Sequence, residues 1–326
     1  MKISKHLFTR ALMIIFAIGV FVYIGVETNW VETWKAVKSA NYLYILLAII
    51  LMTTAHYLRG ARWDQLSRAA GYPINHRRAF YSVMSGYLVN VATSRGGEVV
   101  RCALTAKSEK APIETLVGTV ITERIIDLVI MLFMAALALM LQFDVLYQFA
   151  EPYVIKPLFN NGAYILLALI LTATALYFWR KFTAKKDKKE GGLIQKLLHG
   201  INSAFELENK AKFISYSFAI WFAYWVSLYF QLQALEMTHH FTLFNALAIL
   251  IFSSLGVIIP VPGGAGVWYS IAYGLTLVYG LPQESAKTFG IFTVAFSNIF
   301  HLLLGGISYG LLFFEMQSNE KSESSI

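Results

Sequence analysis

The sequence has little charge for its length and almost no cysteine. Only 14% of its 326 residues are charged and 57% are hydrophobic, whereas soluble domains have about 25% charged and about 45–50% apolar residues. The single cysteine, Cys102, excludes an intramolecular disulfide framework. The deficit of charge argues against a soluble enzyme.

Motifs that carry catalysis or hold a metal are also missing. The sequence has no glycine-rich loop ending in lysine and serine or threonine, no HExxH, and no cysteine–histidine spacing suited to a metal. We therefore predict no catalytic residue, no metal and no cofactor, and we do not expect an enzyme.

Long apolar runs are what the sequence has instead. A bilayer core of about 30 Å needs about 20 residues of helix, and barrel strands would show alternating segments of about ten residues. The sequence favours helices and predicts an all-α polytopic (multi-pass) protein of the cell or inner membrane. The runs with span-like length are Leu7–Val26, Tyr42–Tyr57, Ala163–Trp179, Phe213–Leu235 and Leu243–Ile259.

The basic residues predict the orientation. Of the 27 Lys and Arg, 21 lie in three segments: residues 2–10, 59–110 and 180–212. Cytoplasmic loops carry such an excess, so we expect these segments and both termini in the cytoplasm. The net charge of +8 then reflects topology. We expect no nucleic-acid partner, whereas anionic lipid headgroups fit the same charge.

Two interrupted segments predict re-entrant hairpins. Ala79–Ala92 is too short for a comfortable span, and a crossing there would place the basic residues that follow it outside. We expect a hairpin that enters and leaves on the cytoplasmic side, turning at Thr93–Arg101. The arms Leu243–Ile259 and Val267–Tyr279 flank PVPGGAG, whose prolines and glycines break a helix. They predict a second hairpin, entering from outside.

The chain then reads as a single transmembrane domain with two halves. We expect about six full spans plus two re-entrant helical hairpins, with eight ordinary spans as the alternative. Three crossings in each half invert one half relative to the other, and interrupted segments at matching places point to a transporter's central site. The predicted parts are a first half (1–141), the start of the second half (142–180), a cytoplasmic linker with an amphipathic helix at Leu193–Lys212 (181–212), the rest of the second half (213–314) and a polar tail (315–326).

Charged residues next to the first hairpin are the main candidates for a site. A charge at membrane depth costs about 2.5–3.5 kcal/mol, so such residues pair or serve a function. One interpretation is a structural ion cluster that fixes the hairpin to the third span. The other is that arginines meet an anionic phosphate, with glycines allowing close approach. The candidates are Arg95, Gly96, Gly97, Glu98, Arg101, Glu123, Arg124 and Asp127.

The second half offers fewer polar candidates. The turn Pro262, Gly263 and Gly264 exposes backbone groups where two helices break, which is tolerated only inside protein or around a water-filled cavity. Asn298 and His301 lie close together on the last span. They form either an interhelical hydrogen-bonding strip or a substrate-facing or proton-relay group.

Four motifs in order resemble a known family. GGEVVR (Gly96–Arg101), ERIID (Glu123–Asp127), PVPGGAGV (Pro260–Val267) and the Arg62–Trp63 pair are similar to the flippase-like, lysylphosphatidylglycerol synthase transmembrane-region family, from about Leu7 to Phe314. The resemblance implies movement of lipids or lipid-linked headgroups, and here a stand-alone membrane domain without an aminoacyltransferase domain. The family commonly has a proline just before the GE motif, where this chain has Val91–Ser94. It often has a glutamate shortly after the PVPGGAGV motif, where this chain has Trp268–Ser270. A preference for a cationic headgroup therefore does not carry over.

Three functions compete. The favoured one is translocation of a lipid or lipid-linked headgroup, with an anionic-phosphate lipid as substrate. The second is a non-transporting accessory subunit that binds a membrane glycosyltransferase or lipid-modifying enzyme. The third is a membrane-embedded transferase that uses the acid–base cluster. A hydrophilic cavity joining the hairpins favours the first, and a closed core with an exposed patch favours the second.

Overall fold

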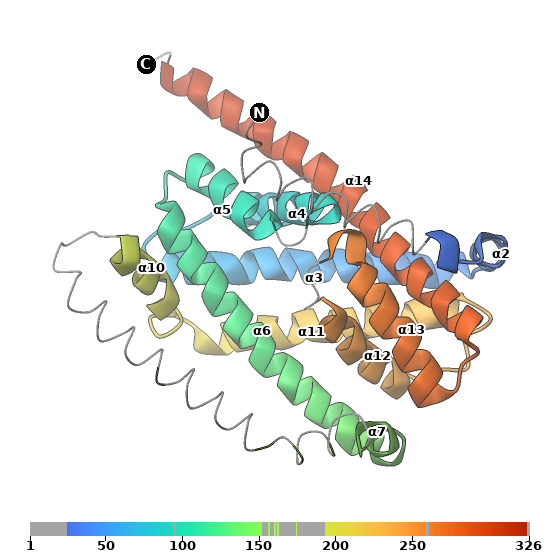
Figure 1. Cartoon of the computed structure of the whole chain (residues 1–326). Coiled ribbons are helices and arrows are strands. Elements are labelled where there is room, and N and C mark those ends of the chain that lie inside the picture. Colours follow the sequence, from blue (N-terminus) through green and yellow to red (C-terminus); the bar gives the residue numbers. More distant parts are fainter. Residues whose placement is uncertain are drawn as a thin grey trace, which may run out of the picture.

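The structure, a computed structural model, describes residues 25–93, 96–151, 193–257 and 261–324, together with residues 156, 160, 162 and 174. These ranges contain helices and no strand, which confirms the all-α prediction (Figure 1). The helices are α2 (Trp30–Lys38), α3 (Tyr42–Ala69), α4 (His76–Ala92), α5 (Gly97–Ser108), α6 (Ile113–Leu141), α7 (Phe143–Ala150), α10 (Leu193–Asn202), α11 (Lys210–Ala234), α12 (Leu243–Gly256), η2 (Pro262–Gly264), α13 (Ala265–Tyr279) and α14 (Gln283–Ser324).

Four of the described helices are long and apolar enough to cross a membrane: α3, α6, α11 and α14 up to Ser318. Three of them confirm predicted spans, because α6, α11 and α14 cover 113–141, 213–234 and 286–314. Many large apolar side chains on α6 and α14 are exposed, as a lipid-facing surface requires. The predicted spans Leu7–Val26 and Ala163–Trp179 fall almost wholly outside the described residues.

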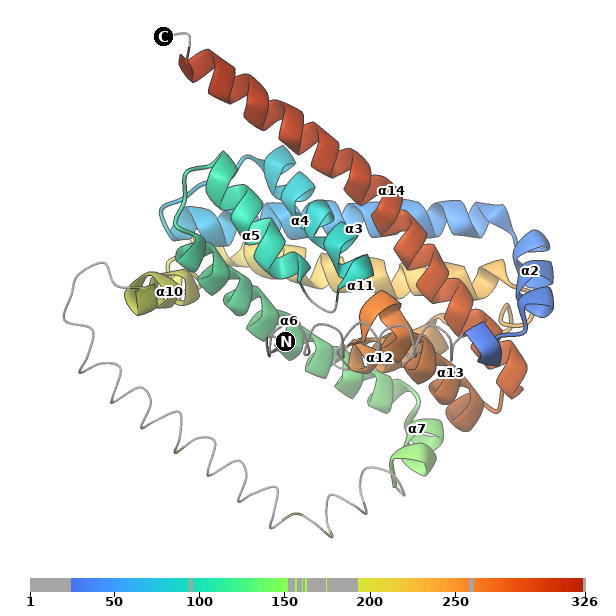
Figure 2. The ribbon, with the colours of Figure 1, turned by 45° about the horizontal axis from the view of Figure 1, so that its top comes forward.

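The sequence placed three helix boundaries wrongly. The second span was expected to end at Tyr57, but α3 continues to Ala69 and is about 42 Å long. The amphipathic helix ends at Asn202 rather than Lys212, and α11 begins at Lys210. The last helix also continues through the predicted tail to Ser324; its C-terminal end extends beyond the other helices (Figure 2). For α3 and α14 polar residues were read as helix ends, whereas the polar residues between Asn202 and Lys210 were read as helix.

Both predicted hairpins are pairs of short helices held together by glycine. A Cβ on Gly97 of α5 would meet the carbonyl oxygen of Gly86 on α4 at 1.9 Å. In the second hairpin, a Cβ on Gly256 of α12 would meet the Gly266 oxygen of α13 at 2.5 Å. Each hairpin therefore closes only because a backbone can approach its neighbour directly.

The contacts between helices repeat from one half to the other. The packing of α2 on α14 matches that of α10 on α6, and α4 on α14 matches α12 on α6. The hairpin pairs α4–α5 and α12–α13 match, as do α5–α6 and α13–α14. The helices α3 and α11 are each other's counterparts and pack against each other (Figure 1). This pattern supports the inverted repeat of two halves.

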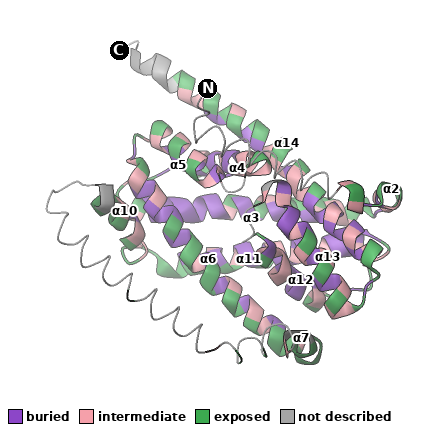
Figure 3. Cartoon of the chain, in the orientation of Figure 1, coloured by how far each residue is buried: buried purple, intermediate pink, exposed green. Residues whose placement is uncertain are grey.

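The α3–α11 pair forms the centre of the molecule. Residues 59–64 of α3 are all buried, and Figure 3 shows α3 as a mainly buried helix crossing the molecule. At one end of the pair the Asn41 N–H donates to the carbonyl of Ala234 at 2.8 Å. The two halves thus meet along α3 and α11, so polar residues on α3 lie between them.

Candidate functional site

Three of the charged candidates gather in a buried cluster between α3, α5 and α6, together with two arginines of α3. Arg62 lies 3.0 Å from Glu123 and 2.8 Å from Asp127, measured from its Nη2 to a carboxylate oxygen. Arg59 pairs with Asp127 at 3.0 Å, and Arg101 pairs with Glu123 at 2.5 Å. All five side chains are at most 8% exposed. The cluster, defined by these five residues, joins the first hairpin to both neighbouring spans.

The cluster is built on complementary spacing of α3 and α6. Arg59 and Arg62 are one turn apart on α3, and Glu123 and Asp127 are one turn apart on α6. The next contact along the helices is a hydrogen bond from the Trp63 indole to Thr119 at 2.9 Å. Spacings of three and four residues place side chains on one helix face, so both sets face each other as α3 and α6 pack.

The cluster has one more positively charged side chain than negatively charged ones. Three arginines face two carboxylates, so the described buried cluster has a formal charge of +1. The Nε atoms of Arg59, Arg62 and Arg101 are buried and have no hydrogen-bond partner among the described residues. A guanidinium can donate from Nε and Nη together to a carboxylate or phosphate. The cluster therefore offers donors and charge to an anion.

Glu98 and Arg124 form a more accessible pair beside the cluster. Arg124 Nε lies 2.6 Å from Glu98 Oε1, and the two side chains are 42% and 36% exposed. Arg124 also contacts Asp127, three residues later on α6, at 3.4 Å. Glu98 thus pairs with Arg124, whereas Arg101 pairs with Glu123. Arg95 lies outside the described residues.

The glycines of the first motif shape the hairpin. Gly96 precedes α5 as its N-cap, and Gly97 is its first residue. The Gly97 N–H donates to Asn90 Oδ1 at 2.8 Å, which ties the end of α4 to the start of α5. These glycines hold the hairpin that carries Arg101 to its partner Glu123.

The PGG turn of the second half also lies where it was expected, between α12 and α13. Gly263 and Gly264 have φ of +69° and +82°, which only glycine adopts readily. Asn298 of α14 donates to the Gly263 carbonyl at 2.9 Å and satisfies the broken backbone. The turn packs on α4, so the two hairpins touch. Asn298 therefore has a demonstrated structural partner.

His301 belongs to a second polar group that the sequence did not reveal. Its Nε2 lies 3.3 Å from Nε2 of His56 on α3, and its ring stacks on Tyr87 of α4 at 4.7 Å between centroids. The Nδ1 of His56 lies 3.4 Å from the Tyr224 hydroxyl on α11. The ring of Tyr224 in turn faces the Arg59 guanidinium at 5.9 Å. This histidine group adjoins the ion cluster.

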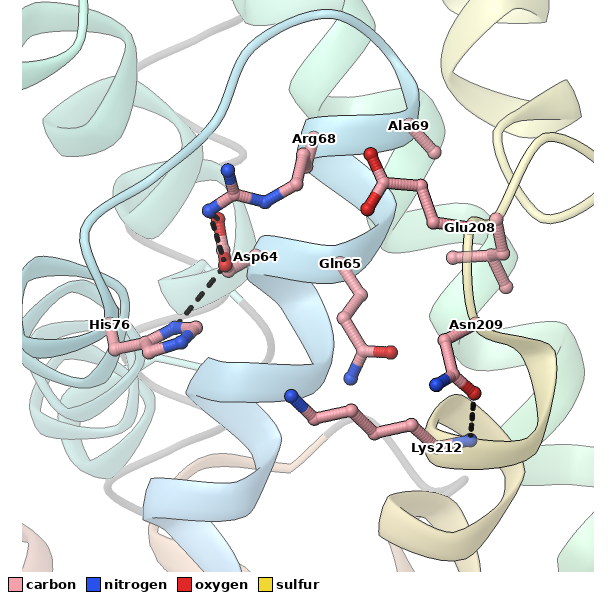
Figure 4. A pocket seen from close by; sticks show the side chains of 9 residues that line it. Asp64, Gln65, Arg68, Ala69, His76, Glu208, Asn209 and Lys212 are labelled. Atoms are coloured by element: carbon pink, nitrogen blue, oxygen red, sulfur yellow. Dashed lines mark hydrogen bonds and ion pairs between the residues drawn. The ribbon is translucent and has the colours of Figure 1, made fainter.

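Two cavities accompany these groups. A polar cavity of about 450 Å³ lies between the end of α3, the start of α4 and the start of α11. In it Asp64 pairs with Arg68 and His76, while Gln65 and Lys212 point toward one another (Figure 4). An apolar groove of about 500 Å³ lies between α2, α3 and α14. Neither is lined by Gly96–Gly97 or Pro262–Gly264, so neither is the expected polar cavity between the hairpins.

Arg59 and Arg62 are the site residues that sequence reasoning missed. They were counted as cytoplasmic, although both are buried in α3. A further sequence pattern is Gly306–Gly310, GISYG, which matches the GxSxG signature of serine hydrolases. It lies inside the continuous helix α14, whereas the signature requires a strand-to-helix turn. No cluster suited to a metal occurs among the described residues.

The known proteins that this chain resembles are membrane proteins. The family described as the lysylphosphatidylglycerol synthase TM region matches residues 10–305. UPF0104 membrane proteins of Pyrococcus horikoshii and Methanothermobacter thermautotrophicus are 23% and 26% identical, covering 87% and 74% of this chain and 90% and 79% of their own lengths. One from Methanocaldococcus jannaschii is 30% identical over 40% of this chain and 39% of its own length. No solved structure matches the chain.

Proposed function

Since the chain belongs to the lysylphosphatidylglycerol synthase transmembrane-region family, we propose that it moves a lipid with an anionic phosphate between the leaflets of the cell membrane. In this proposal its termini and residues 181–212 are cytoplasmic. One observation carries it: the buried cluster of Arg59, Arg62, Arg101, Glu123 and Asp127 has a formal charge of +1. An uncompensated charge at membrane depth is costly, and an anionic headgroup would compensate it.

The position of the cluster supports the same proposal. It includes Arg101 of the first hairpin, and this hairpin touches the PGG turn of the second. A shift of either hairpin would change access to the cluster. The pair Glu98–Arg124 is the more exposed part and gives a phosphate a first contact. If Arg124 leaves Glu98 to bind the phosphate, the positive charge of Arg124 remains paired with an anion.

The test uses vesicles of phosphatidylcholine that contain the protein and a trace of fluorescent phosphatidylglycerol. Movement of the probe from the inner to the outer leaflet is followed by chemical quenching from outside. We expect Arg101→Gln to slow movement about 10–100-fold, which corresponds to about 1.5–3 kcal/mol for a hydrogen bond to a charged group. Arg68→Gln is the matched control, because Arg68 lies outside the cluster. Equal rates for wild type and Arg101→Gln would contradict the proposal.

A second candidate function is an accessory subunit for a membrane glycosyltransferase or lipid-modifying enzyme. The observation in its favour is that the ion cluster is closed: Arg62 and Glu123 are fully buried. In that case the wild-type protein should move no lipid in vesicles by itself. It should instead co-purify with an enzyme, and Arg101→Gln should leave that association intact. A transferase would chemically alter the probe, which extraction and mass spectrometry would detect.

A further inference from the structure

His56 and His301 join the two halves of the protein through their imidazole rings. His56 lies half-way along α3 and is buried, whereas His301 lies on α14 and is only partly buried. Their Nε2 atoms are 3.3 Å apart, close enough for one ring to donate a hydrogen bond to the other. Neither ring is needed for the ion cluster, which is already held by its own pairs.

The pair can take up a further proton without losing its contact. A neutral imidazole has one N–H and one acceptor nitrogen, and an imidazolium has two N–H groups. If one ring is charged, it donates from Nε2 to the bare Nε2 of the neutral ring, and the added proton sits on its own Nδ1.

The groups around the pair decide when this extra charge is tolerated. On α3, Arg59 lies one turn from His56 and contacts the ring of Tyr224. Tyr87 of α4 contacts both histidine rings, and Tyr224 of α11 contacts His56. From α6, Asp127 reaches the pair only through Arg59, to which it is bound at 3.0 Å. Phe300 of α14 covers His56. The nearest fixed charge is therefore a cation on a cluster that already has an excess of positive charge. Burial away from water and this positive charge both disfavour a proton on the histidines, and an arriving anion removes the second of these two costs.

We propose that His56 and His301 form a proton-binding site whose occupancy is coupled to an anionic lipid at the neighbouring ion cluster. The inference rests on the proposed function and adds its coupling to protons. The lipid phosphate offsets the excess charge at Arg59 and so favours the proton. By linkage the proton favours the lipid to the same extent. Lipid affinity should rise as the pH falls, by up to about tenfold per pH unit while one proton is taken up.

Calorimetry of the full-length protein in detergent tests the coupling, with water-soluble short-chain phosphatidylglycerol as the probe. Titrations in two buffers with different ionisation enthalpies give the number of protons taken up on binding. We expect the wild type to take up as much as one proton. We expect His301→Gln to bind the lipid with no proton uptake, since glutamine can donate to His56 but cannot be charged. His240→Gln, an exposed histidine between α11 and α12, should behave as wild type.

Each outcome decides between the two proposals. Lipid binding by the wild type without proton uptake overturns the coupling and leaves the proposed function standing. Proton uptake that persists in both His301→Gln and His56→Gln places the proton elsewhere and also overturns it. If one variant fails to fold, the other provides the comparison. Absence of any binding by the wild type contradicts the proposed function itself.

Discussion

Exchanging an acid or an arginine of the ion cluster should have very unequal effects on stability. Glu123→Gln removes the carboxylate that pairs with Arg62, at 3.0 Å, and with Arg101, at 2.5 Å, and raises the formal charge of the cluster from +1 to +2, while Arg62 keeps Asp127 at 2.8 Å. Each such attraction is worth about 4 kcal/mol at 4 Å and an effective dielectric constant of 20. Removal of one partner of a buried pair typically costs about 3–5 kcal/mol. We expect a loss at least this large for Glu123→Gln.

Arg101→Gln has the opposite effect on the charge. It leaves two arginines and two carboxylates, and Glu123 keeps Arg62 while Asp127 keeps Arg59. The remaining cost is one hydrogen bond to a charged group, about 1.5–3 kcal/mol, and the contact of Arg101 with the Trp63 ring at 4.7 Å, about 0.5–2 kcal/mol. Thermal unfolding in detergent, followed by tryptophan fluorescence, should rank wild type, Arg101→Gln and Glu123→Gln in falling order. If Arg101→Gln melts at as low a temperature as Glu123→Gln, the cluster does not carry an excess positive charge in the folded protein.

The remaining predictions concern topology and the hairpins. A cysteine at position 185, in a Cys102→Ala background, should resist an impermeant reagent added outside the cell, and labelling there would reverse the orientation. Gly97→Ala should open the first hairpin at a cost of about 1–3 kcal/mol or more. The control Gly306→Ala has nothing within 4 Å of the added Cβ and should gain up to about 1 kcal/mol of helix stability. Equal melting temperatures for the two variants would contradict the close approach of α4 and α5. Gly264→Ala should lower stability by about 1–2 kcal/mol because its φ is +82°, and an unchanged melting temperature would show that the turn relaxes.

Apolar run length predicted much of the fold. The spans α6, α11 and α14 and both interrupted hairpins follow from hydropathy, because lipid requires long helices and because proline and glycine break them. Hydropathy also explains why the second span was predicted to end at Tyr57, twelve residues before the end of α3. Hydropathy alone treats Arg59 and Arg62 as the end of a span, while their partners on α6 supply the compensation only after folding.

The candidate site was predicted in part. The structure brings together Arg101, Glu123 and Asp127, with Glu98 and Arg124 beside them, and it pairs Arg101 and Glu98 of α5 with residues of α6. The spacing of Arg59 and Arg62 against Glu123 and Asp127 was visible in the sequence and marks two faces that can meet. The link between His301 and His56 was not visible, since 245 residues separate them and only the packing of α14 near α3 brings them together.

The central claim is that the unpaired donors of the cluster serve a lipid phosphate. The most direct measurement is an electron-microscopy structure of the protein in nanodiscs that contain phosphatidylglycerol. We predict density for a phosphate within hydrogen-bond distance of Nε of Arg59, Arg62 or Arg101, and its loss in Arg101→Gln. A cluster that stays closed in these nanodiscs, with phosphate density only at the membrane surface, would contradict the account.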